Sequence, residues 1–295
     1  MKVETYQVFN PDTIVELDLG ESIQQALALT DRIIGYVADI RPETVTEYIS
    51  ALKKRLAQAV QDFDINTALF GLDEMSQDLE YLKEHPDLQN LTLRFVGKQL
   101  DLPRDFQPGT ESIQVSSLNR VKSAQRLSYH RTKACADALG DEQGIQLWKA
   151  VIAQLLEDNR LEAEQAQQER LEQGQEEPAE PTVAESRERA IKDWTEIGFA
   201  DFTVAVLDEN MTLYRFDRCL VPEALKDFKD PDFAYLCSCY IGDAEGFNAV
   251  RTIHLRRTQT LHHGDFCDEL YWDSRVYTEP PKQPSVEFTQ SLDKD

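Results

Sequence analysis

Apolar residues recur every three to four positions along the first hundred residues, which is the spacing of one face of an α-helix. Pro42 and the His85-Pro86-Asp87 break are typical helix boundaries. Four amphipathic segments with short joints result, at 20–41, 43–60, 65–82 and 88–100. This pattern predicts an antiparallel helical bundle over residues 1–105.

A linker with two prolines and one glycine follows at 102–109 and marks a domain boundary. Helical spacing then resumes from 111 to a stop at Gly140, and again from 142 onward. Thr182 with Glu185 three residues later has the spacing of a capping box, so another helix is expected to begin there.

Beyond residue 198 the pattern changes to alternation, which is typical of strands. The segments 202–207 and 211–216 predict a β-hairpin, and 251–259 predicts a strand whose antiparallel partner is 266–272. We therefore expect an α+β fold, in which the bundle is followed by a domain, residues 106–277, of helices packed on a small antiparallel sheet.

The stretch 157–187 is strongly acidic, with ten acidic residues against three basic ones. Such a segment buries too little apolar area to offset its chain entropy, so we expect an exposed helical insertion with a linker at 173–181. The carboxy-terminal tail 278–295 contains three prolines and few apolar residues, and it is predicted to be disordered.

The charge of the whole chain restricts the classes of partner. A formal net charge of -23 repels nucleic acids and anionic membrane surfaces, so neither is expected as a partner. No apolar run reaches the length of a membrane span, and the start MKVETYQVF lacks the apolar core of a signal peptide, so the expected location is the cytoplasm. Five cysteines without a signal peptide favour free thiols.

Four cysteines and three histidines fall between residues 219 and 267, and such a gathering can indicate a metal site. The cysteines at 237 and 239 form a C-x-C pair rather than the C-x-x-C of tetrahedral zinc loops, so no metal ligands and no cofactor are assigned. The alternative is a cysteine nucleophile with a histidine as base and an aspartate that orients it. Each cysteine taken singly is also typical of a small buried apolar residue.

Alternation limits which of these residues can act together. If Cys267 faces the core, Asp268 faces the other side of the sheet unless a bulge intervenes. His262 and His263 lie in a turn that Asp265 is expected to cap.

Short motifs in this region resemble the carboxy-terminal signature of the L-2-amino-thiazoline-4-carboxylic acid hydrolase family. They agree in order and spacing, and the similarity covers about residues 115 to 275. The motifs are Arg218-Cys219, Leu236-Cys237, Gly246-Phe247-Asn248, Arg257-Thr258-Gln259-Thr260-Leu261 and Gly264-Asp265-Phe266-Cys267-Asp268.

The resemblance implies a bacterial α+β enzyme that hydrolyses a cyclic amidine, opening a thiazoline carboxylate ring toward an S- or N-carbamoyl cysteine. The resemblance implies that Cys267 or Cys237 is the nucleophile and that His263 or His254 is the base. Asp268 or Asp265 is the acid or orienting group. The substrate is held by Arg257, which would grip a carboxylate through a forked pair of hydrogen bonds, together with His254 and Cys219.

The chain also departs from the family pattern, because Glu269-Leu270 follows the last Cys-Asp where Phe-Arg is usual. The resemblance therefore leaves altered or lost activity open, and the small-molecule substrate is not fixed. The alternative is a non-catalytic adaptor or regulatory protein that binds a protein partner through its bundle and acidic arm. A homo-oligomer is compatible with either function.

Overall fold

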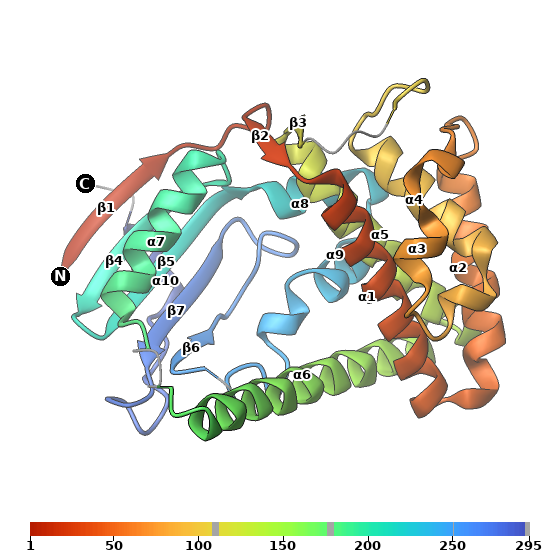
Figure 1. Ribbon diagram of the computed structural model, residues 1–295. Coiled ribbons are helices and arrows are strands. Elements are labelled where there is room, and N and C mark those ends of the chain that lie inside the picture. Colours follow the sequence, from red (N-terminus) through yellow and green to blue (C-terminus); the bar gives the residue numbers. More distant parts are fainter. Residues whose placement is uncertain (108–111, 176–179, 250, 293–295) are drawn as a thin grey trace. The chain divides into compact units, whose positions relative to one another are not determined.

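The computed structural model describes residues 1–107, 112–175, 180–249 and 251–292 (Figure 1). It confirms an α+β fold and contains two compact units. The sheet unit comprises Met1–Asn10, Ile152–Pro222 and Cys239–Asp295, and the bundle unit comprises Pro11–Val151 and Glu223–Ser238.

These boundaries correct the predicted division into 1–105 and 106–277. The first strand of the chain pairs within the sheet, and the helices after residue 116 pack with the preceding ones. Two helices, α6 (Asp141–Glu172) and α8 (Leu220–Leu225), contain unit boundaries.

The sheet unit is built on five antiparallel strands in the order β1-β4-β5-β7-β6. The predicted hairpin forms β4 and β5, and the predicted pair near the carboxy-terminal end forms β6 and β7. The strands are β1 (Lys2–Gln7), β4 (Ala200–Asp208), β5 (Met211–Cys219), β6 (Ile253–Arg256) and β7 (Cys267–Asp273).

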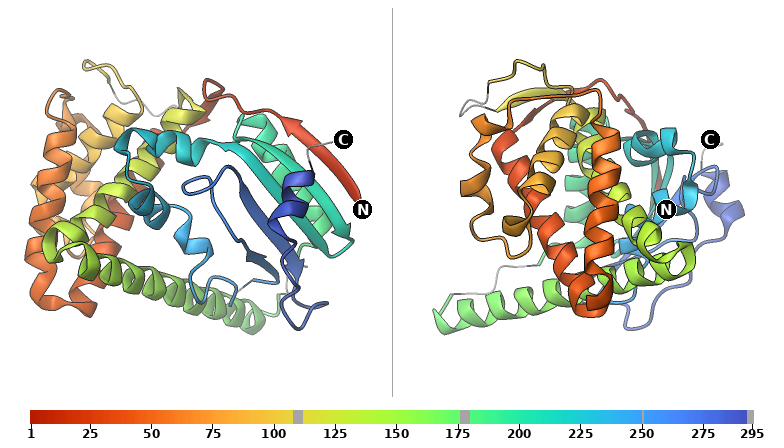
Figure 2. Two further views of the ribbon diagram at one scale, coloured as in Figure 1. Left: turned by 180° about the vertical axis from the view of Figure 1, so that it is seen from behind. Right: turned by 90° about the vertical axis from the view of Figure 1, so that its right-hand side faces the viewer.

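A helix packs on each face of this sheet. Helix α7 (Val183–Glu196) lies in front of the sheet in Figure 1, and α10 (Val286–Ser291) lies in front of it when seen from behind (Figure 2, left). On the α7 face, Trp194 packs against the buried Phe202 and Phe216. On the α10 face, the core contains Ala205, Leu213, Leu270, Trp272 and Leu292.

Helix α10 corrects the prediction of a disordered tail over 278–295, of which 293–295 lie outside the described residues. Ser285 caps the helix by accepting a hydrogen bond from the Phe288 N–H at 3.2 Å. Thr289 is fully buried and Leu292 is 8% exposed, so a few apolar contacts order a segment whose average composition is polar.

Two features of the acidic region agree with its sequence. The described residues of α6 from 161 onward are exposed on all sides, as expected of a solvated helix. Thr182 and Glu185 form the predicted capping box, with the Glu185 N–H donating to Thr182 Oγ1 at 3.2 Å. The predicted linker at 173–181 falls partly on residues 176–179, which lie outside the described residues.

The bundle unit consists of long and short helices around α5, which contacts α2, α4 and α9. The short strands β2 (Ile14–Leu17) and β3 (Ile113–Ser116) form an antiparallel pair beside them. The helices are α1 (Leu19–Ile40), α2 (Val45–Ala59), α3 (Leu72–Ser76), α4 (Pro86–Gln99), α5 (Ser117–Leu139) and α9 (Pro231–Cys237). Single 3-10 turns occupy Pro42–Thr44, Thr67–Phe70, Leu82–Glu84, Lys226–Phe228 and, in the sheet unit, Tyr240–Gly242.

The prediction of one continuous helix over 65–82 was wrong. Gly71 has a φ of 61°, a left-handed conformation that interrupts helical hydrogen bonding between Thr67–Phe70 and α3. Members of the predicted apolar stripe are nevertheless buried before and after this break, namely Ile65, Leu72 and Leu82.

Candidate functional site

Strand β7 presents Cys267, Glu269 and Tyr271 on the sheet face that is covered by α7. Cys267 pairs with Phe216 and Glu269 with Tyr214 on β5, and these aromatic residues belong to the core cluster on that face. Since side chains alternate along a strand, Asp268, Leu270 and Trp272 lie on the opposite face. The strand therefore brings one carboxylate, one phenol and one thiol to the same side.

Arg257, just beyond β6, reaches the same cluster and is held by two carboxylates. Its Nη2 lies 3.3 Å from Glu269 Oε1, and its Nε lies 3.1 Å from Asp243 Oδ1. Burial lowers the pKa of Arg257, but the charges of Glu269 and Asp243 outweigh this and raise it above its ordinary value. The guanidinium is thus a permanent cation between two acidic groups.

Gly242 makes room for this arrangement. A Cβ atom at position 242 would lie 2.5 Å from Arg257 Nη2 and 3.2 Å from Leu255 Cδ2. A side chain there would displace the guanidinium from its carboxylates.

Tyr271 completes the polar cluster by donating its hydroxyl hydrogen to Glu269 Oε2 at 2.7 Å. Burial, followed by the negative charge of Glu269, raises the pKa of Tyr271 well above its ordinary value, so the phenol stays protonated. The Glu269 side chain is 14% exposed, and Arg257 and Tyr271 hold one oxygen each. A carboxylate has about four lone-pair positions, so capacity remains on both oxygens.

Two thiols near this cluster, Cys267 and Cys219, are protonated. Burial, followed by the charge of Glu269, raises the pKa of Cys267 well above its ordinary value, and burial likewise raises the pKa of Cys219. Cys239 interacts electrostatically with both of them, and all five cysteines of the chain are free, as predicted. At neutral pH Cys267 and Cys219 are therefore weak nucleophiles.

A cavity of about 100 Å³ lies between α7 and the sheet, and Tyr271 connects it to the polar cluster. Three of its walls are aromatic: Trp194, Tyr214 and Tyr271. The other lining residues are Val183, Ser186, Arg187, Ala190, Thr212 and Ile253. Its volume corresponds to a few water molecules, or to one small ring.

Asp268, predicted as an acid or orienting group, instead holds the loop between β6 and β7. The side chain is fully buried, and its carboxylate accepts hydrogen bonds from the backbone N–H groups of Thr258 and Gln259 at 2.7 and 3.0 Å. The Thr258 hydroxyl and Gln283 Nε2 donate to its second oxygen at 2.5 and 3.1 Å. All of these contacts are internal, and they lie on the face opposite to Cys267.

The predicted histidine bases do not join the cluster, which corrects that assignment. His254 pairs with Trp272 across the β6–β7 ladder and stacks edge-on against it with ring centroids 5.5 Å apart, so it lies on the face opposite to Glu269. His263 and Asp265 lie in the turn before β7 and are exposed.

Cys237 belongs to the bundle unit, whereas Cys267 belongs to the sheet unit. Its thiol donates to the Ala234 carbonyl at 3.2 Å, a contact one turn back in α9. Of the predicted site residues, the cluster thus contains Cys267, Arg257 and the nearby Cys219. Arg257, predicted to grip a substrate carboxylate, directs its Nε and Nη2 at Asp243 and Glu269.

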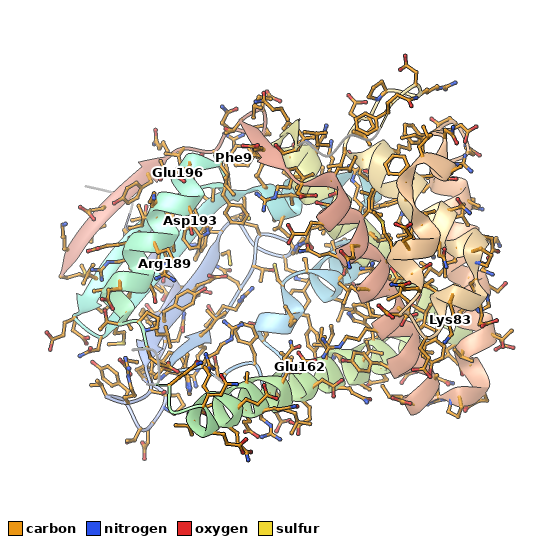
Figure 3. The ribbon with its side chains drawn as sticks, in the orientation of Figure 1. Phe9, Lys83, Glu162, Arg189, Asp193 and Glu196 are labelled. Atoms are coloured by element: carbon orange, nitrogen blue, oxygen red, sulfur yellow. The ribbon has the colours of Figure 1, made fainter. Side chains whose placement is uncertain are left out.

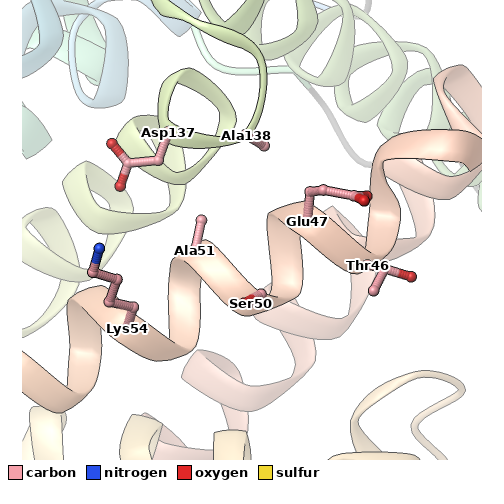
Figure 4. A pocket seen from close by; sticks show the side chains of 7 residues that line it. All are labelled: Thr46, Glu47, Ser50, Ala51, Lys54, Asp137 and Ala138. Carbon is pink, nitrogen blue, oxygen red and sulfur yellow. The ribbon is translucent and has the colours of Figure 1, made fainter.

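A second cavity, of about 590 Å³, lies in the bundle unit between α2 and the end of α5 (Figure 4). Thr46, Glu47, Ser50 and Lys54 line it together with Asp137. Arg55 pairs with Asp137 at 2.6 Å, and none of the predicted site residues contributes to the walls. Within the described part of the chain, no group of three His, Cys, Asp or Glu side chains is arranged to hold a metal ion.

No protein-family model, curated protein or solved structure matches the chain. Across the described residues, no helix combines the length and the apolar character required to cross a membrane.

Sequence reasoning missed Glu269, Tyr271 and Asp243. The alternation that placed Cys267 on one face also places Glu269 and Tyr271 there, so two of these residues could have been found from β7 alone. Asp243 lies in a loop that reaches Arg257 through tertiary structure, and no local pattern indicates it.

Proposed function

We propose that the sheet unit hydrolyses a small cyclic amidine and that Glu269 is the base for this reaction. The observation that carries the proposal is a partly buried carboxylate, held by Arg257 and Tyr271, beside an aromatic-walled cavity. The family resemblance of the motifs around Arg257 and Cys267 supports the same reaction class.

The reaction requires one proton acceptor and one water molecule. Glu269 takes a proton from water as the water oxygen bonds to the amidine carbon, which becomes tetrahedral. The ring C–S or C–N bond then breaks as the new C–OH becomes C=O. The carboxyl group gives its proton to the leaving sulfur or nitrogen, and the hydroxyl proton passes to the Glu269 carboxylate and from there to solvent. Breaking C–S gives an N-carbamoyl product, and breaking C–N gives an S-carbamoyl product.

The charges of the cluster suit such a substrate. Asp243, Arg257 and Glu269 together carry one net negative charge, which favours a protonated amidine over a neutral ring. Cys267 is protonated and buried, so water activated by Glu269, rather than a thiolate, is the nucleophile. The free thiols fit a reducing compartment, and we place the activity in the cytoplasm.

The test is direct incubation with 2-amino-thiazoline-4-carboxylic acid, followed by NMR detection of the ring-opened product. Wild-type protein and Asp265→Asn, which changes an exposed carboxylate in the nearby turn, are expected to open the ring at equal rates. Absence of ring opening by both proteins would reject the proposal and leave the second candidate.

The second candidate is a non-catalytic adaptor, which the exposed acidic part of α6 favours. Residues 161–172 of this helix are all exposed, including Leu161 and Leu171 at 49% and 61%. An adaptor would bind its protein partner without any ring-opening activity, so the same incubation separates the two functions.

A further inference from the structure

One stripe of α7 lines the cavity against the sheet. Val183, Arg187, Ala190 and Trp194 recur at helical spacing and share the side of the helix that contacts β5 and β7. Three of these residues are apolar, so a guanidinium in the same row is unusual and requires a partner.

The partner that Arg187 has in the described chain is uncharged. Its Nη1 donates to Thr212 Oγ1 at 3.2 Å, and Thr212 is fully buried beneath it. Among the described residues no carboxylate forms an ion pair with Arg187. Glu4 is close enough for the two charges to interact, but Lys2 pairs with Glu4 at 2.8 Å.

An arginine that has no carboxylate in an ion pair among the described residues is unusual in a chain with 54 acidic and 31 basic residues. Arg257, in the neighbouring cluster, is held by two carboxylates. Arg187 therefore keeps donors that no carboxylate of the described residues takes up, and a guanidinium offers these donors in a planar fork.

The cavity walls restrict the rest of the ligand. Tyr214 stands nearly perpendicular to Trp194 at a centroid distance of 5.3 Å, and to Tyr271 at 5.5 Å. Val183, Ala190 and Ile253 add small apolar surfaces. Flat aromatic walls around about 100 Å³ fit a single planar ring.

We propose that this cavity binds a monocyclic carboxylate and that Arg187 is its anion anchor. The inference rests on the proposed function in one respect: the ring lies between Arg187 and Tyr271, so its opposite edge faces the Glu269 cluster. Arg187 thereby takes the role that the sequence suggested for Arg257.

Benzoate is a suitable probe, because it has the ring and the carboxylate but cannot be hydrolysed, and benzamide is its neutral isostere. Binding to the full chain is measured by NMR titration of the probe. Wild-type protein is expected to bind benzoate more tightly than benzamide, and Arg187→Gln should weaken benzoate binding about 10- to 100-fold, the cost of one charge-assisted pair. Benzamide binding should be unchanged.

Arg189→Gln is the matched control. Arg189 lies on the same helix (Figure 3), is exposed and carries the same charge, so its replacement should leave benzoate binding within about twofold of wild type. If Arg187→Gln does not fold, Arg187→Lys keeps the charge but loses the fork and must still weaken benzoate binding. Equal benzoate binding by wild type and the Arg187 variant, or no binding to wild type at about 10 mM, would overturn the anchor.

The two proposals can fail separately. Benzoate binding that depends on Arg187, without ring opening of the amidine, removes the proposed function and leaves the anion site. Ring opening with benzoate binding that does not depend on Arg187 removes the anion site alone.

Discussion

Asp268 holds Thr258 by two hydrogen bonds, one from the backbone N–H at 2.7 Å and one from the hydroxyl at 2.5 Å. The Gln259 N–H adds a third at 3.0 Å, so one buried carboxylate fixes the loop that carries Arg257 into the cluster. Asp268, which the motif resemblance linked to catalysis, thus stabilises the fold of this loop.

Replacing Asp268 by Asn should therefore lower stability. The amide keeps the shape but loses the charge, and one of its two ends presents a donor to groups that are themselves donors. We expect the free energy of unfolding to fall by about 2–3 kcal/mol in urea denaturation. Asp265→Asn, at an exposed turn position, should change it by less than about 0.5 kcal/mol. Similar small losses for both variants would show that Asp268 does not support the loop.

Gly242 and Arg257 should be energetically coupled. Gly242→Ala places a methyl group against the guanidinium and should cost about 1–3 kcal/mol of unfolding free energy. In an Arg257→Ala background only the contact with Leu255 Cδ2 at 3.2 Å remains, so the same change should cost at least about 1 kcal/mol less than in wild type. Urea denaturation of the two single variants and the double variant measures this coupling, and additive losses would contradict it.

His130, on α5 in the bundle unit, should make stability depend on pH. Burial, followed by the charges of Arg55 and Arg126, lowers the pKa of His130 from 6.5 to about 4. The folded state therefore keeps the ring neutral while the unfolded chain takes up a proton below pH 6.5. The stabilisation is complete above pH 6.5 and is lost as the pH falls toward 4.

The total effect of His130 is about 3 kcal/mol. His130→Phe, which keeps the edge-on contacts with Phe95 and Phe228, should flatten the pH dependence of the urea midpoint between pH 6.5 and 5. His263→Asn, at an exposed position, should leave it unchanged. An equal slope in the His130→Phe variant and wild type would contradict this account.

The elements that were predicted correctly are those with local causes. The Thr182–Glu185 capping box and the hairpin of β4 and β5 depend on residues a few positions apart, so their sequences contain the necessary information. Strand β1 was missed because its partner is remote: Lys2 pairs with Val206 and Gln7 with Asp201. The break at Gly71 was missed because the apolar spacing continues through it.

The candidate site also has a part that local sequence could predict and a part that depends on remote contacts. Alternation along β7 correctly separated Cys267 from Asp268, and it contains the position of Glu269 as well. The contacts that give Glu269 its chemistry come from Arg257 and Asp243, which reach it from outside β7. Residue type alone favoured the cysteines and histidines as catalytic residues. Their burial and the direction of their side chains decide whether they can act, and both are properties of the folded chain.

The central claim is that a carboxylate, not a thiol, performs the ring opening. The most direct measurement is kcat/KM for 2-amino-thiazoline-4-carboxylic acid with Glu269→Gln and Cys267→Ser compared with wild type. Glu269→Gln should lower the rate about 10²- to 10⁴-fold, the usual contribution of a general base, while Cys267→Ser stays within about tenfold of wild type. A rate lost in Cys267→Ser and retained in Glu269→Gln would contradict the account.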